Sequence, residues 1–214
     1  MPSKLENAER VLTWADFKVI ERDQEKKRSE MTDVEKERDK EDAAIGVYYE
    51  WKTVPFETVP GTRPPRFRVK DEIVVRVFNK PEETVVKRRA LEASQRQKDA
   101  LLAHEQGHYD VAALLARDLF VDLVTLAGRE FADVTAIRTA VAAKVDPFKS
   151  KLDAIQKLYD GDTKHGAGDA PQQEWLTLIA RARTEPRIPR TLGRDGQPLR
   201  LTLLQAMRDA GKTL

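Results

Sequence analysis

The feature that most constrains the fold of this chain is a long helical pattern over residues 94–126. Its apolar positions recur at the spacing of one helix face, and they include Leu101, Ala112, Leu115 and Leu119. Ser94 is a suitable N-cap, and Gly128 is a suitable stop. The sequence therefore predicts one long helix with a buried stripe, against which other elements must pack.

Two histidines lie on this stripe. Residues 104–108 have the sequence His-Glu-Gln-Gly-His, and helix residues four apart lie on the same face. Two imidazoles at that spacing can hold one metal ion, and Glu105 then lies beside the ion, able to take a proton from a bound water. We therefore expect His104 and His108 to face inward as metal ligands.

Gly107 supports a functional interpretation of the motif. A glycine inside a helix costs about 1 kcal/mol relative to alanine, which indicates that another group approaches the helix closely there. The alternative is a chance match, in which two histidines and an exposed glutamate lie on an ordinary amphipathic helix.

A catalytic zinc ion usually has three protein ligands. The chain contains three histidines in all, and the third is His165. It lies in residues 159–169, a segment rich in Gly and Asp that we expect to be an ordered loop. We favour His165 as the third ligand because imidazole is the commonest ligand for transition metals; Asp160 and Asp162 remain alternatives.

Two segments upstream of the helix have the β-branched and alternating composition of strands, at residues 43–54 and 67–78. A Pro-rich segment, residues 55–66, is expected to form the loop between them. Residues 130–158 and the segment from Pro171 predict further helices. The sequence thus predicts an α+β fold, in which a small antiparallel sheet packs on the long helix and more helices follow.

The domain organisation follows from composition. We expect a domain over residues 1–184 with a charged insert at 21–42, followed by a basic extension at 185–214. Net charge is +2, and the extension has no aromatic residue for base stacking, which argues against a nucleic-acid partner.

No apolar run is long enough to cross a membrane, and the N-terminus has no hydrophobic signal region. We expect a soluble, cytoplasmic protein, or a periplasmic or secreted one if the N-terminus was trimmed. The absence of cysteine excludes disulfides and thiolate ligands. Substrate preference and oligomeric state are not set by any motif.

Several segments together resemble a known family. They are residues 12–17, residues 101–111, and the positions Tyr159, Asp160, Thr163, His165, Gly166, Gln173 and Trp175. Over roughly residues 10–180 the chain resembles the bacterial family of predicted zinc-dependent proteases called domain of unknown function 922. The resemblance implies a metallopeptidase-like site and often an exported protein; the charged insert and the basic extension depart from the family's pattern.

The resulting hypothesis is a zinc metallopeptidase that cleaves a peptide or protein substrate. His104, His108 and His165 would hold Zn²⁺, and Glu105 would act as general base on a metal-activated water. Tyr159 would donate a hydrogen bond to the oxyanion, or would only close the helix end. The alternative is a non-catalytic binding or scaffold protein, which would use the charged insert and the basic extension as interaction surfaces.

Overall fold

The computed structural model describes residues 2–21, 41–166, 168–186 and 199–214. The predicted charged insert lies outside the described residues except at its two ends, and residues 187–198 of the predicted basic extension lie outside them too. None of the described helices combines the length and the apolar character that a membrane crossing needs.

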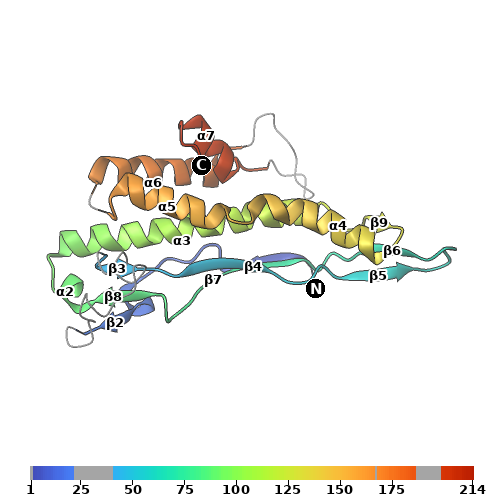
Figure 1. Cartoon of the computed structure of the whole chain (residues 1–214), viewed down its shortest axis with the longest axis horizontal. Helices are drawn as coiled ribbons and strands as arrows, with labels where there is room; N and C mark the ends of the chain where they lie inside the picture. The colour runs from blue at the N-terminus through green and yellow to red at the C-terminus, as the bar shows by residue number, and fades with distance from the viewer. Residues whose placement is uncertain (1, 22–40, 167, 187–198) are drawn as a thin grey trace.

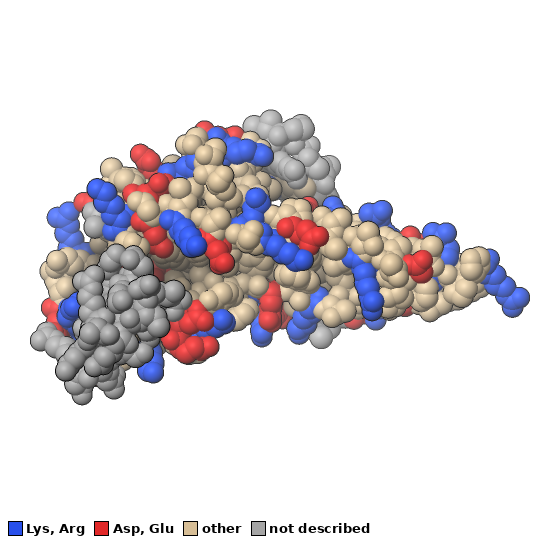
Figure 2. Space-filling model, in the orientation of Figure 1, with Lys and Arg blue, Asp and Glu red and all other residues tan. Residues whose placement is uncertain are grey.

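The molecule is elongated, and α3 (Gln95–Val124) runs along its middle (Figure 1). Strands lie along one side of α3, and α4 (Val134–Val145), α5 (Lys151–Thr163) and α6 (Asp169–Thr184) lie along the other. This arrangement confirms the predicted α+β class. On the face shown in Figure 2, basic and acidic side chains are interspersed along the described part of the molecule.

The start of α3 is the predicted one. The Ser94 hydroxyl accepts a hydrogen bond from the backbone N–H of Gln97, and the Gln97 side chain pairs back to the backbone N–H of Ser94. Gly128 follows the helix in the left-handed conformation, with φ of 79°. The middle of α3 is buried on most sides because it contacts strands on one side and α5 and α6 on the other.

The main sheet has the strand order β1-β7-β4. β4 (Val47–Trp51) and β7 (Val74–Asn79) are antiparallel, as predicted, with Tyr49 opposite Val77. β1 (Lys4–Glu6) joins β7 in parallel, so the sheet is mixed rather than purely antiparallel.

A second small sheet lies near the N-terminal end of α3 and contains β2 (Lys18–Ile20), β8 (Val85–Lys87) and β3 (Ala43–Ala44) in the order β2-β8-β3. α2 (Arg88–Leu91) then leads from β8 toward α3. β3 and β4 are therefore edge strands of two different sheets, joined by the short segment around Ile45.

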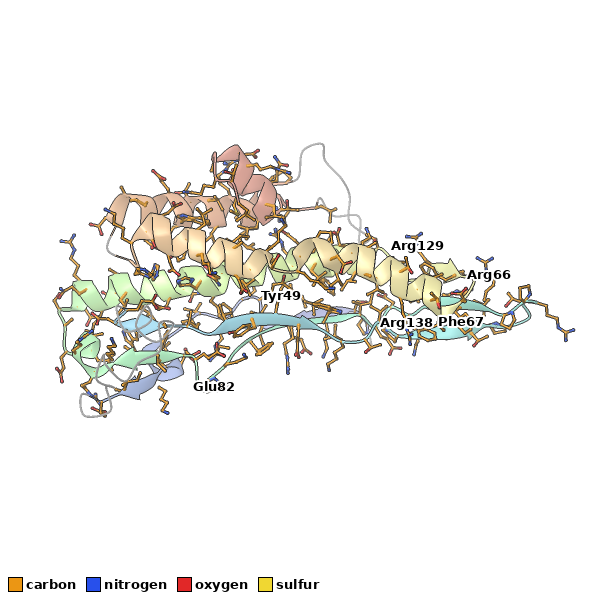
Figure 3. All side chains as sticks on the ribbon, viewed as in Figure 1. Tyr49, Arg66, Phe67, Glu82, Arg129 and Arg138 are labelled. Carbon is orange, nitrogen blue, oxygen red and sulfur yellow. The ribbon has the colours of Figure 1, made fainter. Side chains whose placement is uncertain are left out.

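The prediction of a loop over residues 55–66 was wrong in part. β5 (Phe56–Val59) pairs with β6 (Arg66–Val69), and β9 (Glu130–Phe131) completes a third sheet. The prolines do not break β5 because they flank it, at Pro55 and Pro60. Arg66, Phe67, Arg129 and Arg138 lie toward this end of the molecule (Figure 3).

The helix α5 also extends further than predicted. Tyr159 and Asp160 belong to its last turns and not to a loop, because Tyr159 and Thr163 are four residues apart and both are buried. The Thr163 hydroxyl donates to the backbone oxygen of Tyr159 at 2.7 Å. Lys164 then ends the helix in the left-handed conformation.

The end of the chain packs on the same core. α7 (Leu203–Asp209) contacts α6 and α3, and Leu203 and Met207 are fully or almost fully buried. Asp118 of α3 accepts a hydrogen bond from the backbone N–H of Leu203 at 2.8 Å. The described residues after 198 are thus part of the folded body.

Candidate metal centre

The His-Glu-x-x-His helix brings its two imidazoles together. His104 and His108 lie one turn apart on α3, and their Nε2 atoms are 3.2 Å apart. Both side chains are almost completely buried. The sequence prediction placed these two nitrogens on one inward face, and the structure shows that face covered by α5.

α5 adds a carboxylate to this pair. Asp160 Oδ1 lies 2.8 Å from His108 Nε2 and 3.3 Å from His104 Nε2. The oxygen is buried, and among the described residues it has no hydrogen-bond partner of suitable geometry. Three donor atoms of the kinds that zinc prefers therefore converge on one point.

Two glutamines fix the orientation of the imidazoles. Gln156 Oε1 contacts His108 Nδ1, and Gln156 Nε2 donates to the backbone oxygen of His108 at 3.1 Å. Gln172 Oε1 lies 3.3 Å from His104 Nδ1. Because an amide oxygen only accepts, both histidines carry their proton on Nδ1 in the neutral form, which leaves Nε2 free to bind a metal.

The neighbouring charges favour a cation in the centre. Burial lowers the pKa of His104. In His108, burial is outweighed by the adjacent carboxylate of Asp160 and by the charge of Glu105, which together raise the pKa to about 9. Burial is also outweighed in Asp160, where the two adjacent imidazoles hold the pKa of the carboxyl well below its usual range. The surroundings thus stabilise positive charge between these groups.

Glu105 lies beside the two histidines. Its side chain is 2% exposed, and Oε2 has no hydrogen-bond partner among the described residues. Burial raises the pKa of its carboxyl to about 7. A buried carboxylate oxygen without a partner is costly unless another group completes its environment.

Tyr159 packs against the ring of His104. Its hydroxyl donates to the backbone oxygen of His104 at 3.0 Å and accepts from Gln172 Nε2 at 2.7 Å. The two rings stack, with centroids 4.8 Å apart. The hydroxyl proton is therefore engaged with α3, and an oxyanion would have to compete with that bond. A Cβ on Gly107 would overlap the same hydroxyl, so the close approach predicted at Gly107 is the approach of Tyr159.

The other two candidate ligands do not belong to the group formed by His104, His108 and Asp160. His165 Nδ1 is 3.1 Å from Glu41 Oε1 and 3.7 Å from Asp160 Oδ1, and it groups with those carboxylates rather than with His104 and His108. Asp162 Oδ2 accepts hydrogen bonds from Trp175 Nε1 and from Lys212 Nζ. Of the three alternatives left open by the sequence, Asp160 is the one that joins the histidine pair.

The centre opens into a cleft of about 540 Å³. Its walls are residues 43–48 from β3 and β4, the N-terminal half of α3, and one face of α5. Glu105 and His165 also line it. The cleft gives a substrate access to the histidines and places the edges of two sheets beside them.

The sequence interpretation did not include Gln156 or Gln172. A signal for Gln156 was present, because Gln156, Tyr159, Asp160 and Thr163 follow the spacing of one helix face. That signal was missed because the end of α5 was taken for a loop. Gln172 had no such signal, since only the packing of α6 brings it to His104.

The fold and the centre define an α+β domain with a buried His-Glu-x-x-His helix and a carboxylate from a later helix beside its two imidazoles. Residues 17–166 match the family described as bacterial protein of unknown function (DUF922), and the chain belongs to this family. Comparison with curated proteins and with solved structures finds no significant match.

Proposed function

We propose that this protein is a zinc-dependent peptidase whose metal is held by His104, His108 and Asp160. The observation that carries the proposal is the convergence of two Nε2 atoms and one carboxylate oxygen beside Glu105, whose Oε2 has no hydrogen-bond partner among the described residues. Two imidazoles and a carboxylate form a common ligand set of catalytic zinc sites, which leave a further position open.

The fit of zinc rests on the donor chemistry and on the unsatisfied oxygen of Asp160. A bound zinc ion would act as a Lewis acid and lower the pKa of a water toward about 7. Gln156 and Gln172 hold the imidazoles so that Nε2 faces the centre. Tyr159 acts as a positioning residue, since it ties α5 and α6 to the turn of α3 that carries His104.

Glu105 is the general base in this proposal. Its carboxylate lies in the cleft next to the ligand histidines, and Oε2 is available to accept the proton of the attacking water. The same carboxyl group can then return the proton to the leaving amine. Its burial keeps competing water away and holds the side chain in one place.

The cleft suits an extended peptide. Residues 43–48 line it, and they include parts of β3 and β4, which are edge strands of their sheets. An extended chain can add to such an edge through main-chain hydrogen bonds, without a demand for particular side chains. This supports a peptide or an unfolded protein segment as the substrate class.

The deciding experiment combines metal analysis with a cleavage assay. Protein purified without chelator should contain about one tightly bound zinc per chain, and His108→Ala should lose it. Glu105→Gln should keep the zinc and lose cleavage of an unfolded protein by about 100-fold or more. Zinc-free wild-type protein that also fails to bind added zinc would refute the proposal.

A matched control is Glu82→Gln. Glu82 is exposed, does not line the cleft, and lies at the lower edge of the view in Figure 3. This variant should keep both zinc and activity. Zinc-loaded wild-type protein that cleaves no peptide in a broad library would favour the non-catalytic binding protein.

A further inference from the structure

A second group of potential ligands lies at the mouth of the same cleft. His165 Nδ1, Glu41 Oε1 and Asp160 Oδ1 lie within 4.8 Å of one another. The His165 side chain is 47% exposed, and those of Asp160 and Glu41 are 25% and 22% exposed. This group is therefore more open to solvent than the histidine pair on α3.

The chain holds His165 in place by an unusual backbone conformation. Lys164, His165 and Gly166 have φ of 50°, 53° and 83°, and the first two are left-handed without being glycine. Such residues cost free energy and persist where their surroundings fix them. A Cβ on Gly166 would lie 3.1 Å from the Cβ of His104, so the turn packs directly on the first centre.

Asp160 connects the two groups. Its Oδ1 lies 2.8 Å from His108 Nε2 on one side and 3.7 Å from His165 Nδ1 on the other, and it is buried without a hydrogen-bond partner of suitable geometry. Glu105, 2% exposed, also leaves one oxygen unsatisfied in this cleft. These unsatisfied oxygens favour more positive charge in the cleft than the described side chains supply.

We propose that Glu41, Asp160 and His165 form a second divalent-cation site, which shares Asp160 with the zinc centre. The inference rests on the proposed function through that shared carboxylate. One imidazole and two carboxylates suit a divalent transition metal such as Zn²⁺. The affinity is lower than at the first centre because the site has one imidazole instead of two and is more exposed to water.

Titration of chelator-treated protein with Zn²⁺ alone tests the proposal. The wild type should bind two equivalents, one tight and one weaker. His165→Asn removes the imidazole and keeps a residue that tolerates the left-handed backbone. This variant should bind the tight equivalent with unchanged affinity and lose the weaker one.

Glu41→Gln should lower the affinity for the second zinc equivalent by about tenfold or more, since even the loss of a residue that only hydrogen-bonds to a metal ligand costs that much affinity. Asp153→Asn is the matched control: Asp153 is an exposed carboxylate that lines the cleft and belongs to neither ligand group. It should leave both equivalents unchanged.

The outcomes separate the two proposals. One tight equivalent in both wild type and His165→Asn would overturn the second site and leave the first intact. A weaker first equivalent in His165→Asn would overturn it as well, because His165 would then be a ligand of the first ion. Wild-type protein that binds no tight zinc would remove the zinc centre itself and the second site with it.

Discussion

The hydroxyl of Tyr159 occupies the space that a side chain on Gly107 would need. From there it reaches the backbone oxygen of His104, one turn earlier on α3. The glycine inside the His-Glu-x-x-His motif thus lets a residue of α5 contact the backbone of the helix that carries the ligands. The spacing of α3 and α5, and with it the position of Asp160, depends on this contact.

Gly107→Ala should therefore destabilise the protein although alanine favours helices. The added methyl group meets the Tyr159 hydroxyl, and overpacking of this kind costs about 1–3 kcal/mol. Urea unfolding measures the change, and zinc affinity should fall with it because α5 is displaced.

Gly161→Ala is the control for this substitution. Gly161 also lies in a helix, but nothing lies near the position of its Cβ. Alanine there should raise the free energy of unfolding by about 0.5–1 kcal/mol. Equal effects of the two substitutions would show that Tyr159 does not constrain Gly107.

Gln156→Leu and Gln172→Leu should each lower zinc affinity by about 10- to 100-fold, because the imidazoles lose the acceptor that orients them. Competition with a chromophoric chelator measures the affinity. Gln173→Leu changes an exposed neighbour of Gln172 and should have no effect. Normal affinity in both buried variants would contradict the orienting role.

Asp160→Asn should abolish tight zinc binding because the amide oxygen carries no charge to offset the ion. Asp162→Asn should keep zinc binding, since that carboxylate bonds to Trp175 and Lys212 instead. Metal analysis after dialysis distinguishes the two. Zinc retained in Asp160→Asn and lost in Asp162→Asn would show that the ligand assignment is wrong.

Asp118→Ala should lower the free energy of unfolding by about 3 kcal/mol or more. The carboxylate is 7% exposed, pairs with Arg117 at 2.6 Å and accepts from the backbone N–H of Leu203. Its loss leaves a largely buried guanidinium without its partner and frees the start of α7. Asp122→Ala, one turn later on α3, is the control, and the difference between the two unfolding curves measures the effect.

The long helix and the histidine pair could be predicted because both depend on local spacing. A cap at Ser94, a periodic apolar stripe and two histidines four apart are properties of one segment. The strands β4 and β7 could be predicted for a similar reason, since alternating residues fit a strand whatever the partner. Their antiparallel pairing was expected because one loop was predicted to join them.

The proposed carboxylate ligand could not be predicted in this way. Asp160 and His165 are five residues apart, and which of them faces α3 depends on where α5 ends. Gly161 and Asp162 suggested an early end, whereas burial of Tyr159 and Thr163 extends the helix past Asp160. The third sheet escaped prediction because β9 comes from a segment some 60 residues beyond its partner β6.

The proposed ligands come from different helices, His104 and His108 from α3 and Asp160 from α5, so a bound ion would cross-link the two helices. If zinc binds the folded chain and not the unfolded chain, it stabilises the folded chain by about 2.7 kcal/mol when free zinc is 100 times the dissociation constant. The thermal midpoint of unfolding should then rise with free zinc. The thermal midpoint, followed across a series of zinc concentrations, would report the occupancy of the centre without an activity assay.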